Sequence, residues 1–154
     1  MNPLIFIFAI LDISSLLFIK HGIRKIKSFD PEPYQTQIAA EIDDFNPEEI
    51  LGRKFARRLD RFAQLACVAA KEAIKDSGLF LESLNLDRFS VLIGSGIGGI
   101  STLSDQISVL DEKGPSRISP FLVPMMLSDM ASGQVSMMLG TKGPNFATVS
   151  ACAS

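Results

Sequence analysis

The most restrictive feature of this sequence is a short apolar run that leads directly into a cluster of glycines. Residues 89–93, Phe-Ser-Val-Leu-Ile, are aromatic and β-branched, and the glycine-rich stretch Gly94–Gly99 follows without a break. Such a run is typical of a buried strand, and glycines permit the tight turn by which a strand enters a helix. A helix is expected from this turn to about Glu112, where Gly114 and Pro115 end it.

The rest of the chain alternates helices and strands. Asn46-Pro47-Glu48-Glu49 (residues 46–49) is typical of a helix start, with a capping side chain followed by proline at the first helical position. Apolar residues at spacings of three and four predict a long helix over 53–77 that ends at Gly78, and its alanines predict close packing against another element. A methionine-rich helix is expected over 125–139 and a last strand over 145–150. This alternation predicts an α/β fold with a largely parallel sheet.

Two proline-containing stretches are predicted to be irregular. Residues 28–41 include Pro31 and Pro33, and residues 119–124 begin and end with Ser-Pro and Val-Pro pairs. Proline removes a backbone donor and restricts the residue before it, so both stretches are expected to be surface loops.

Length and charge narrow the class of protein. A chain of 154 residues can bury one core of ordinary size, so a single domain is expected. The 15 basic and 17 acidic residues give a net charge of -2, which predicts no nucleic-acid partner. Its two cysteines, Cys67 and Cys152, cannot form a disulfide framework, and Cys67 falls in the apolar stripe of the long helix. A reducing, cytoplasmic location is expected.

The N-terminal segment differs from the rest in composition. Residues 4–19 are almost wholly apolar, interrupted by Asp12 and two serines. A transmembrane helix needs about 20 apolar residues, and a buried acidic group opposes insertion, so a membrane anchor is not favoured. The alternatives are a buried strand or helix, or a start of the chain assigned wrongly. We therefore treat residues 1–21 as an atypical apolar segment and residues 22–154 as the domain.

The glycine-rich stretch has two interpretations. Gly94, Gly96 and Gly99 have the spacing of a dinucleotide-binding turn, in which backbone N–H groups at a helix start hold a pyrophosphate. Asp111, after a possible strand over 107–110, lies where a ribose-binding acid would be expected, although 17 residues beyond Gly94 is short for that role. The other interpretation is a turn whose glycines let two elements pack closely. The spacing alone does not decide between them.

Cys152 is the candidate nucleophile. It follows the last predicted strand and has alanines on both sides, which leave room for a substrate. A cysteine where a strand turns into a helix gains nucleophilicity, because free N–H groups favour the thiolate. The alternative is a buried free cysteine that acts as a small apolar residue.

Four motifs in order give the chain a resemblance to a known family. They are Ile93-Gly94-Ser95-Gly96-Ile97-Gly98-Gly99, Ser119-Pro120-Phe121-Leu122-Val123-Pro124, Gly143-Pro144-Asn145 and Val149-Ser150-Ala151-Cys152-Ala153-Ser154. From about Gly22 to Ser154 the chain resembles the N-terminal half of a β-ketoacyl-acyl-carrier-protein synthase, of the elongating synthase II type.

The resemblance implies a thiolase-like fold, of which this chain is the N-terminal half-domain, and a homodimer. It implies fatty acid biosynthesis by decarboxylative condensation of an acyl thioester with malonyl-acyl carrier protein, without a cofactor or metal. Cys152 matches the nucleophile, which is the first residue of a buried helix and supplies an oxyanion-hole N–H. Ile97 matches a residue that lines the acyl pocket, and Phe121 and Leu122 match a loop that contributes to the partner subunit's pocket.

The chain also departs from the family pattern. Residues 1–20 lack the β-branched strand and Thr-Gly-x-Gly turn with which family members open, and no residue matches the family's two histidines that promote decarboxylation. His21 is not expected to be catalytic. We therefore expect this polypeptide alone not to condense acyl groups, and to associate through apolar faces such as the methionine-rich helix. The alternatives are a nucleotide-binding module and a noncatalytic partner of a complete synthase.

Overall fold

The computed structural model describes residues 22–154, so the predictions for the apolar segment 4–19 fall outside it. The described chain divides into two units, residues 22–46 and residues 47–154. The larger unit contains six helices and two strands: α2 (Pro47–Leu51), α3 (Arg53–Ala56), α4 (Arg61–Ser77), β3 (Val91–Gly94), α5 (Ile100–Lys113), α6 (Leu122–Met126), α7 (Met130–Leu139) and β4 (Asn145–Thr148). Short 3-10 turns occupy Leu81–Ser83, Leu86–Arg88, Pro115–Arg117 and Ala151–Ala153.

The smaller unit is an antiparallel strand pair, β1 (Ile23–Lys25) and β2 (Ile38–Ala40). Arg24 donates to the carbonyl of Glu41 at 2.7 Å and pairs with Asp43 at 2.7 Å. A hydrogen bond from Lys27 and the nearby positive charges lower the pKa of Asp43. The prediction of an irregular stretch over residues 28–41 is wrong at its end, because pairing with β1 makes Ile38–Ala40 a strand.

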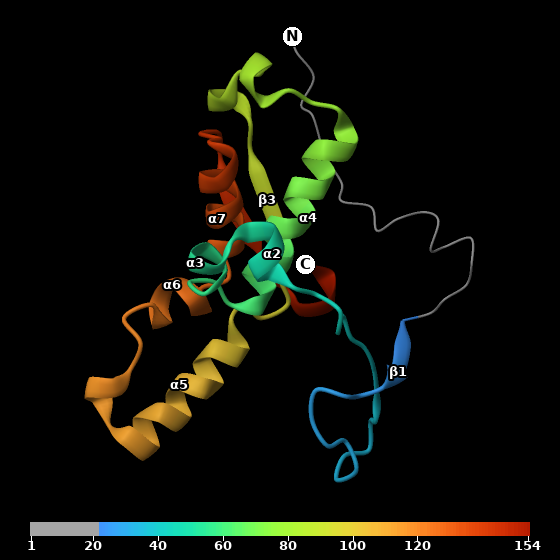
Figure 1. The fold of residues 1–154 in the computed structure, drawn as a ribbon, viewed down its shortest axis with the longest axis vertical. Helices are drawn as coiled ribbons and strands as arrows, with labels where there is room; N and C mark the ends of the chain where they lie inside the picture. The colour runs from blue at the N-terminus through green and yellow to red at the C-terminus, as the bar shows by residue number, and fades with distance from the viewer. Residues whose placement is uncertain (1–21) are drawn as a thin grey trace. The chain divides into compact units, whose positions relative to one another are not determined.

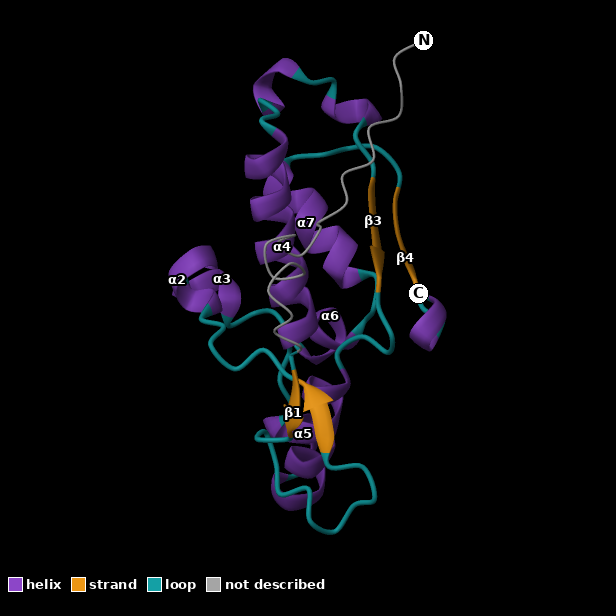
Figure 2. Ribbon diagram, turned by 90° about the vertical axis from the view of Figure 1, so that its right-hand side faces the viewer, coloured by secondary structure: helices purple, strands orange, loops and turns teal. Residues whose placement is uncertain are grey.

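The core of the larger unit lies between α4, α7 and β3. Its buried residues are Leu59, Ala63, Cys67, Val91, Ala131 and Val135. Small side chains on both helices let them approach closely, as the alanines of the long helix predicted. β3 and β4 form a parallel pair in which Val91 is opposite Asn145, and Figure 2 shows the two strands side by side with the helices on one face. The strand predicted over residues 89–93 was expected to be buried. In β3 this holds for Val91 but not for Leu92, which is exposed.

The helix predicted over 53–77 is two helices. α3 ends at Ala56, and α4 begins after Asp60, whose side chain accepts a hydrogen bond from the N–H of Phe62. The apolar spacing continues through this break, so the pattern alone did not reveal it. Gly78 ends α4 with a φ of 66°, as predicted.

The segment predicted as one helix over 125–139 is also divided. α6 already begins at Leu122, inside the predicted loop, and α7 begins at Met130. α6 ends where it contacts the glycine-rich turn. The carbonyls of Met125 and Met126 lie against Gly99, and the carbonyl of Met126 accepts a hydrogen bond from the N–H of Gly99 at 3.1 Å. Of the methionines, Met137 on α7 is clearly exposed, at 65%.

Helix α5 confirms the prediction of a helix after the glycine-rich turn. It runs from Ile100 to Lys113, so the possible strand over 107–110 is wrong and Asp111 is a helical residue. None of its side chains is fully buried. In Figure 1, α5 extends away from the body formed by α4, α7 and β3.

Candidate active site

The candidate site lies at the carboxyl edge of the β3–β4 pair. Because the strands are parallel, the turns that follow them leave the sheet at the same edge. The N–H of Ser95, after β3, donates to the carbonyl of Thr148, at the end of β4, at 3.0 Å. The hydroxyl of Ser154 donates to the carbonyl of Ser95 at 3.0 Å. The glycine-rich stretch and the turn that contains Cys152 are therefore in direct contact.

Cys152 lies in the 3-10 turn Ala151–Ala153 and is exposed. The resemblance implied the first residue of a buried helix at this position, whereas Cys152 is exposed and is the second residue of the 3-10 turn. Ala151, just before it, has a φ of 51°, a left-handed conformation that residues with a Cβ rarely adopt. The backbone therefore bends sharply at the residue that precedes the thiol.

Two backbone N–H groups near the end of the glycine-rich turn are bonded within the protein. Gly98 donates to the hydroxyl of Ser95 at 3.0 Å, and Gly99 donates to the carbonyl of Met126 at 3.1 Å. A Cβ at Gly99 would overlap the carbonyl oxygen of Met125. These glycines therefore serve close packing against α6, which is the second of the two interpretations drawn from the sequence.

A carboxylate already occupies the start of α5. Asp60, which is only 6% exposed, accepts hydrogen bonds from the N–H and the hydroxyl of Thr102 at 3.0 and 2.6 Å. A phosphate bound at the same helix start would meet this negative charge and find fewer free N–H groups. The geometry therefore argues against the nucleotide-binding interpretation.

The predicted pocket residues lie on two neighbouring segments. Ile97 is 65% exposed at the tip of the glycine-rich turn, and its carbonyl accepts a hydrogen bond from the hydroxyl of Ser128 at 3.1 Å. Phe121 precedes α6 and is 41% exposed, and Leu122 is the first residue of α6 and is half-buried. The structure thus joins the Ile97 turn to the α6–α7 connection, while no described hydrogen bond joins Phe121 or Leu122 to Cys152.

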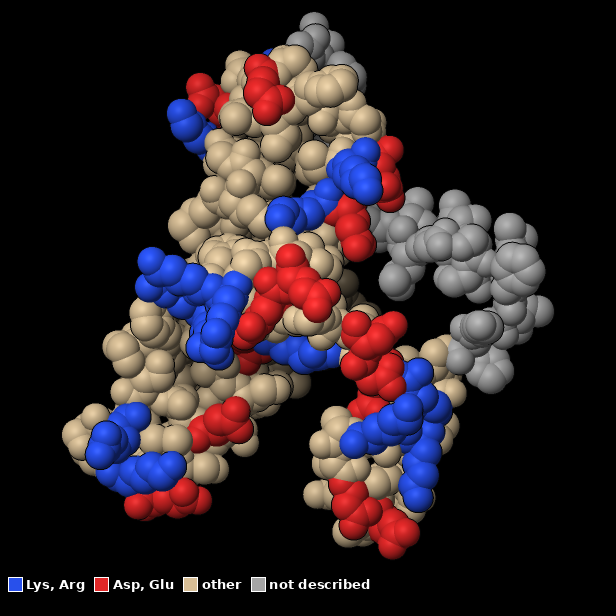
Figure 3. Space-filling view, viewed as in Figure 1, with Lys and Arg blue, Asp and Glu red and all other residues tan. Residues whose placement is uncertain are grey.

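Sequence reasoning missed a basic surface beside this site. Its members are exposed residues of α3, of the turn after it and of the first position of α4: Arg53, Lys54, Arg57, Arg58 and Arg61. Figure 3 shows the basic side chains gathered around α3, where Glu48 pairs with Arg57 at 3.3 Å. The guanidinium of Arg58 stacks over the ring of Phe121, 5.3 Å from its centroid. Local charge density would have revealed this surface, which the net charge of the whole chain conceals.

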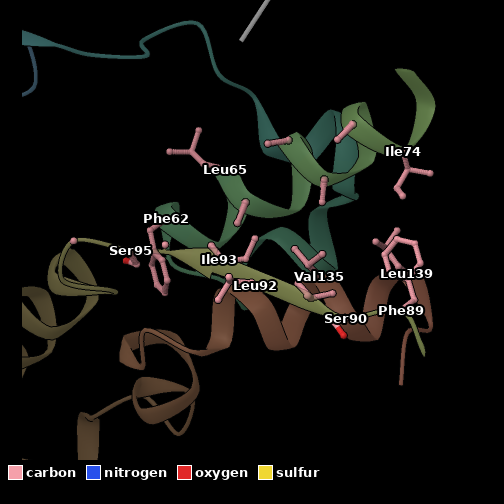
Figure 4. Close-up of a pocket in the computed structure, with 17 residues that line it drawn as sticks. Phe62, Leu65, Ile74, Phe89, Ser90, Leu92, Ile93, Ser95, Val135 and Leu139 are labelled. Atoms are coloured by element: carbon pink, nitrogen blue, oxygen red, sulfur yellow. The ribbon is translucent and has the colours of Figure 1, made fainter. Parts of the chain in front are cut away.

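An apolar groove of about 720 Å³ runs along β3 and reaches the glycine-rich stretch at Gly94, Ser95 and Gly96. It is lined by α4, α7 and β3, with Phe62 and Ser95 at one end and Ile74 and Leu139 at the other (Figure 4). Its lining includes no cysteine, histidine or charged side chain. The described lining can therefore hold apolar groups, and its polar side chains are the hydroxyls of Ser90 and Ser95.

Residues 22–154 contain neither a cluster of metal-binding side chains nor a membrane-spanning helix. Within that range, no group of three or more His, Cys, Asp or Glu side chains could hold a metal ion. Nor does any helix in the range have the length and apolar character that a membrane crossing requires.

Comparison with known proteins gives consistent matches. Residues 13–154 match the model of the family described as beta-ketoacyl synthase, N-terminal domain. The chain is 53% identical over 133 residues to 3-oxoacyl-(acyl-carrier-protein) synthase 2 of Staphylococcus aureus, covering 86% of this chain and 33% of that protein. The chain therefore spans about a third of the length of the curated relatives it matches.

Two solved structures share its architecture. The ishigamide ketosynthase/chain length factor matches with a TM-score of 0.74 and 23% identity, over 88% of this chain and 34% of its own. A type II PKS acyl-carrier protein in complex with its ketosynthase matches with a TM-score of 0.62 and 24% identity, over 66% of this chain and 29% of its own. At these identities the likeness shows the fold alone.

Proposed function

The chain belongs to the β-ketoacyl synthase family, and we propose that it forms the part of a 3-oxoacyl-acyl-carrier-protein synthase that holds the acyl group during condensation. The likeness to ketosynthases confirms the thiolase-like α/β fold predicted from the sequence. The observation on which the proposal depends is the contact between the turn of Cys152 and the glycine-rich turn, through Ser154 and Ser95.

The proposed first step is the transfer of an acyl group to Cys152. Its sulfur, as a thiolate, attacks the carbonyl carbon of an acyl thioester and forms the new bond between that carbon and Sγ, and collapse of the tetrahedral intermediate breaks the bond between the carbon and the carrier's sulfur. The carrier's thiol leaves and takes up the proton that the Cys152 thiol has lost. Exposure of Cys152 and its two small neighbours support this role, because an incoming thioester can reach the sulfur.

The second step is condensation. A malonyl thioester loses carbon dioxide, and the resulting carbanion attacks the acyl carbon on Cys152, so the sulfur leaves and a 3-oxoacyl thioester forms. Decarboxylation needs groups that stabilise the developing charge. The sequence offers His21 as its one histidine, outside the described residues. The residues that the structure describes, 22–154, support the first of these two steps.

The proposed acyl pocket uses the apolar residues named from the resemblance. Ile97 would contact the acyl chain, because its side chain is exposed at the tip of a turn whose backbone is fixed. Phe121 and Leu122 would extend into the pocket of a second copy in a homodimer. The exposure of Phe121 supports this arrangement, since an aromatic ring at the surface is stabilised by a partner that covers it.

The proposed partner is an acyl carrier protein that presents the thioester. An acidic face on such a carrier would be recognised by the basic surface around α3, where Lys54 and Arg58 are exposed. One of the structural neighbours is itself a ketosynthase in complex with its acyl-carrier protein. We place this reaction in the cytoplasm, where the unpaired Cys67 and Cys152 stay reduced.

Acylation of the intact chain tests the proposal directly. The purified chain is incubated with acyl-loaded carrier protein, and mass spectrometry of the protein and its peptides locates any added acyl group. We expect one acyl group on the peptide that contains Cys152, none in a Cys152→Ser variant and normal loading in a Cys67→Ala variant. Absence of an acyl adduct, or an adduct that persists in Cys152→Ser, would contradict the proposal.

A further inference from the structure

Asp60 connects the first turns of two helices through one buried carboxylate. Its Oδ1 accepts from the N–H of Phe62 at 3.2 Å and so caps α4. Its Oδ2 accepts from both the N–H and the hydroxyl of Thr102, in the first turn of α5. Hydrogen bonds to a charged acceptor are stronger than neutral ones, and both helix starts favour a negative charge. One side chain therefore fixes two helix starts relative to each other.

The two helices differ in how the rest of the protein holds them. α4 contributes Ala63, Cys67 and Val68 to the core, whereas α5 has no fully buried residue. α5 packs mainly on α6 and on the 3-10 turn Pro115–Arg117, which follows α5 in the chain. The bonds between Asp60 and Thr102 are therefore a main attachment of the start of α5 to the core.

This attachment lies just beyond the turn that presents Ile97. On the strand side the turn is held at Ser95, whose N–H donates to the carbonyl of Thr148. On the helix side it is held at Gly99, whose N–H donates to the carbonyl of Met126, and then at Thr102 by Asp60. A turn fixed at both ends presents the side chain between them in one place, which a pocket of defined length requires.

We propose that Asp60 is a positioning residue for the acyl pocket: by holding Thr102 it sets where the Ile97 side chain lies at the edge of the sheet. The inference rests on the proposed function, because Ile97 matters only if an acyl chain lies against it. Asp60 itself is buried and acts through the turn, without touching the substrate.

Substitutions at Thr102 separate this role from the capping of α4. Thr102→Val removes the hydroxyl that donates to Asp60 and leaves the bond between Asp60 and Phe62 in place. Thr102→Ser restores the hydroxyl as the conservative variant. Asn85→Ala is the matched control, since it removes an exposed cap bond, from the N–H of Asp87 at 3.1 Å, before β3, whereas the glycine-rich turn follows β3.

Amide hydrogen exchange of the full chain is the first measurement. We expect Thr102→Val to speed exchange at residues 98–103 about tenfold while the amides of α4 keep their protection. Thr102→Ser should restore slow exchange, and Asn85→Ala should not change it. Asp60→Asn should speed exchange in one of the two helix starts, because its single amide oxygen can replace only one of the two carboxylate oxygens. Unchanged exchange at 98–103 in Thr102→Val, or an equal rise throughout α4, would overturn the proposal.

The second measurement is the ratio of Cys152 acylation rates with octanoyl and palmitoyl thioesters. Loss of overall stability would slow both, whereas a displaced Ile97 should change their ratio, by about threefold or more, in Thr102→Val only. An unchanged ratio with faster exchange would overturn the link to the pocket. If the wild-type chain accepts neither acyl group, the proposed function fails, and hydrogen exchange still decides whether Asp60 holds the turn.

Discussion

The two turns at the carboxyl edge of the sheet are held in different ways. Three hydrogen bonds hold the glycine-rich turn. The N–H of Gly98 donates to the hydroxyl of Ser95, and the N–H of Gly99 donates to the carbonyl of Met126. The carbonyl of Ile97 accepts from the hydroxyl of Ser128. The turn that contains Cys152 contacts this edge through Ser154, and its side chains are exposed.

This difference separates two requirements of an acyl-transfer site. A pocket needs a rigid wall. The glycine-rich turn can form such a wall, because backbone atoms of α6 lie directly against the turn. A nucleophile needs access, and the exposed Cys152 has it. In this chain the proposed pocket wall, the glycine-rich turn, is held by several hydrogen bonds, while the turn that contains the proposed nucleophile, Cys152, contacts it through Ser154. Four substitutions or titrations test this contrast.

The largest effect on stability is expected in the glycine-rich turn, at Gly99. Gly99→Ala places a methyl group against the carbonyl of Met125 and 2.7 Å from Cα of Met126, so backbone must move. We expect a loss of about 3 kcal/mol or more in the free energy of unfolding, measured by urea denaturation. Gly96→Ala is the matched control in the same turn, because nothing lies within 4 Å of its added methyl group, and it should change stability by less than about 0.5 kcal/mol. Equal effects of the two substitutions would show that the turn is not packed closely.

An intermediate effect is expected where β4 begins. The buried hydroxyl of Ser132 can donate to the carbonyl of Asp129, just before α7. It also lies 2.9 Å from Oδ1 of Asn145, the first residue of β4. Ser132→Ala leaves that amide oxygen without this partner, which should cost about 2 kcal/mol of stability in thermal or urea unfolding. Ser108→Ala, which removes an exposed hydroxyl on α5, should cost less than about 0.5 kcal/mol. A loss no larger than that of Ser108→Ala would mean that the start of β4 is held by other contacts.

The two cysteines extend the contrast to pH. Burial raises the pKa of the Cys67 thiol from 9.0 to about 11, against a smaller opposite effect of Lys71. Below pH 9 the folded and unfolded chains both keep this proton, whereas between pH 9 and 11 only the folded chain keeps it. Stability should therefore fall by about 1 kcal/mol per pH unit across that window as pH rises.

Urea unfolding at a series of alkaline pH values measures this slope. Cys67→Ala should remove the contribution, and Cys152→Ala, which changes an exposed thiol, should retain it. Alkylation at mildly alkaline pH should modify Cys152 and leave Cys67 intact. Equal alkylation of both residues in the folded chain would contradict the burial of Cys67.

Local sequence was sufficient where an element is specified by its own residues. The strand before the glycines, the helix after them and the helix ends at Gly78 and Gly140 were all predicted, since glycine in a left-handed conformation is a local signal. The order of the four motifs likewise identified the family without a structure. The place of Cys152 after a strand also followed from local pattern.

Features that depend on distant partners were not predictable in this way. The apolar spacing runs unbroken through Asp60, and the bond from this residue to Thr102, 42 residues away, has no local signal. The end of α6, before the break that precedes α7, lies against Gly99, which is also distant in sequence. β2 is a strand because β1 pairs with it, although two prolines precede it. The basic surface joins α3 to Phe121 across the fold, so a linear pattern shows its charges but not its neighbour.

The smallest stability effect, and the one that tests the contact between the turns, is expected at Ser154. Its hydroxyl donates to the carbonyl of Ser95 and accepts from the N–H of Ser150 at 2.6 Å. Ser154→Ala removes both bonds in an exposed turn, so stability should change by less than about 0.5 kcal/mol. The rate of Cys152 alkylation should nevertheless change, because the turn that contains the thiol loses its attachment to the glycine-rich turn. Ser108→Ala is the control, because it removes a hydroxyl elsewhere. An unchanged alkylation rate in Ser154→Ala would mean that the contact between Ser154 and Ser95 does not set the position of the Cys152 thiol.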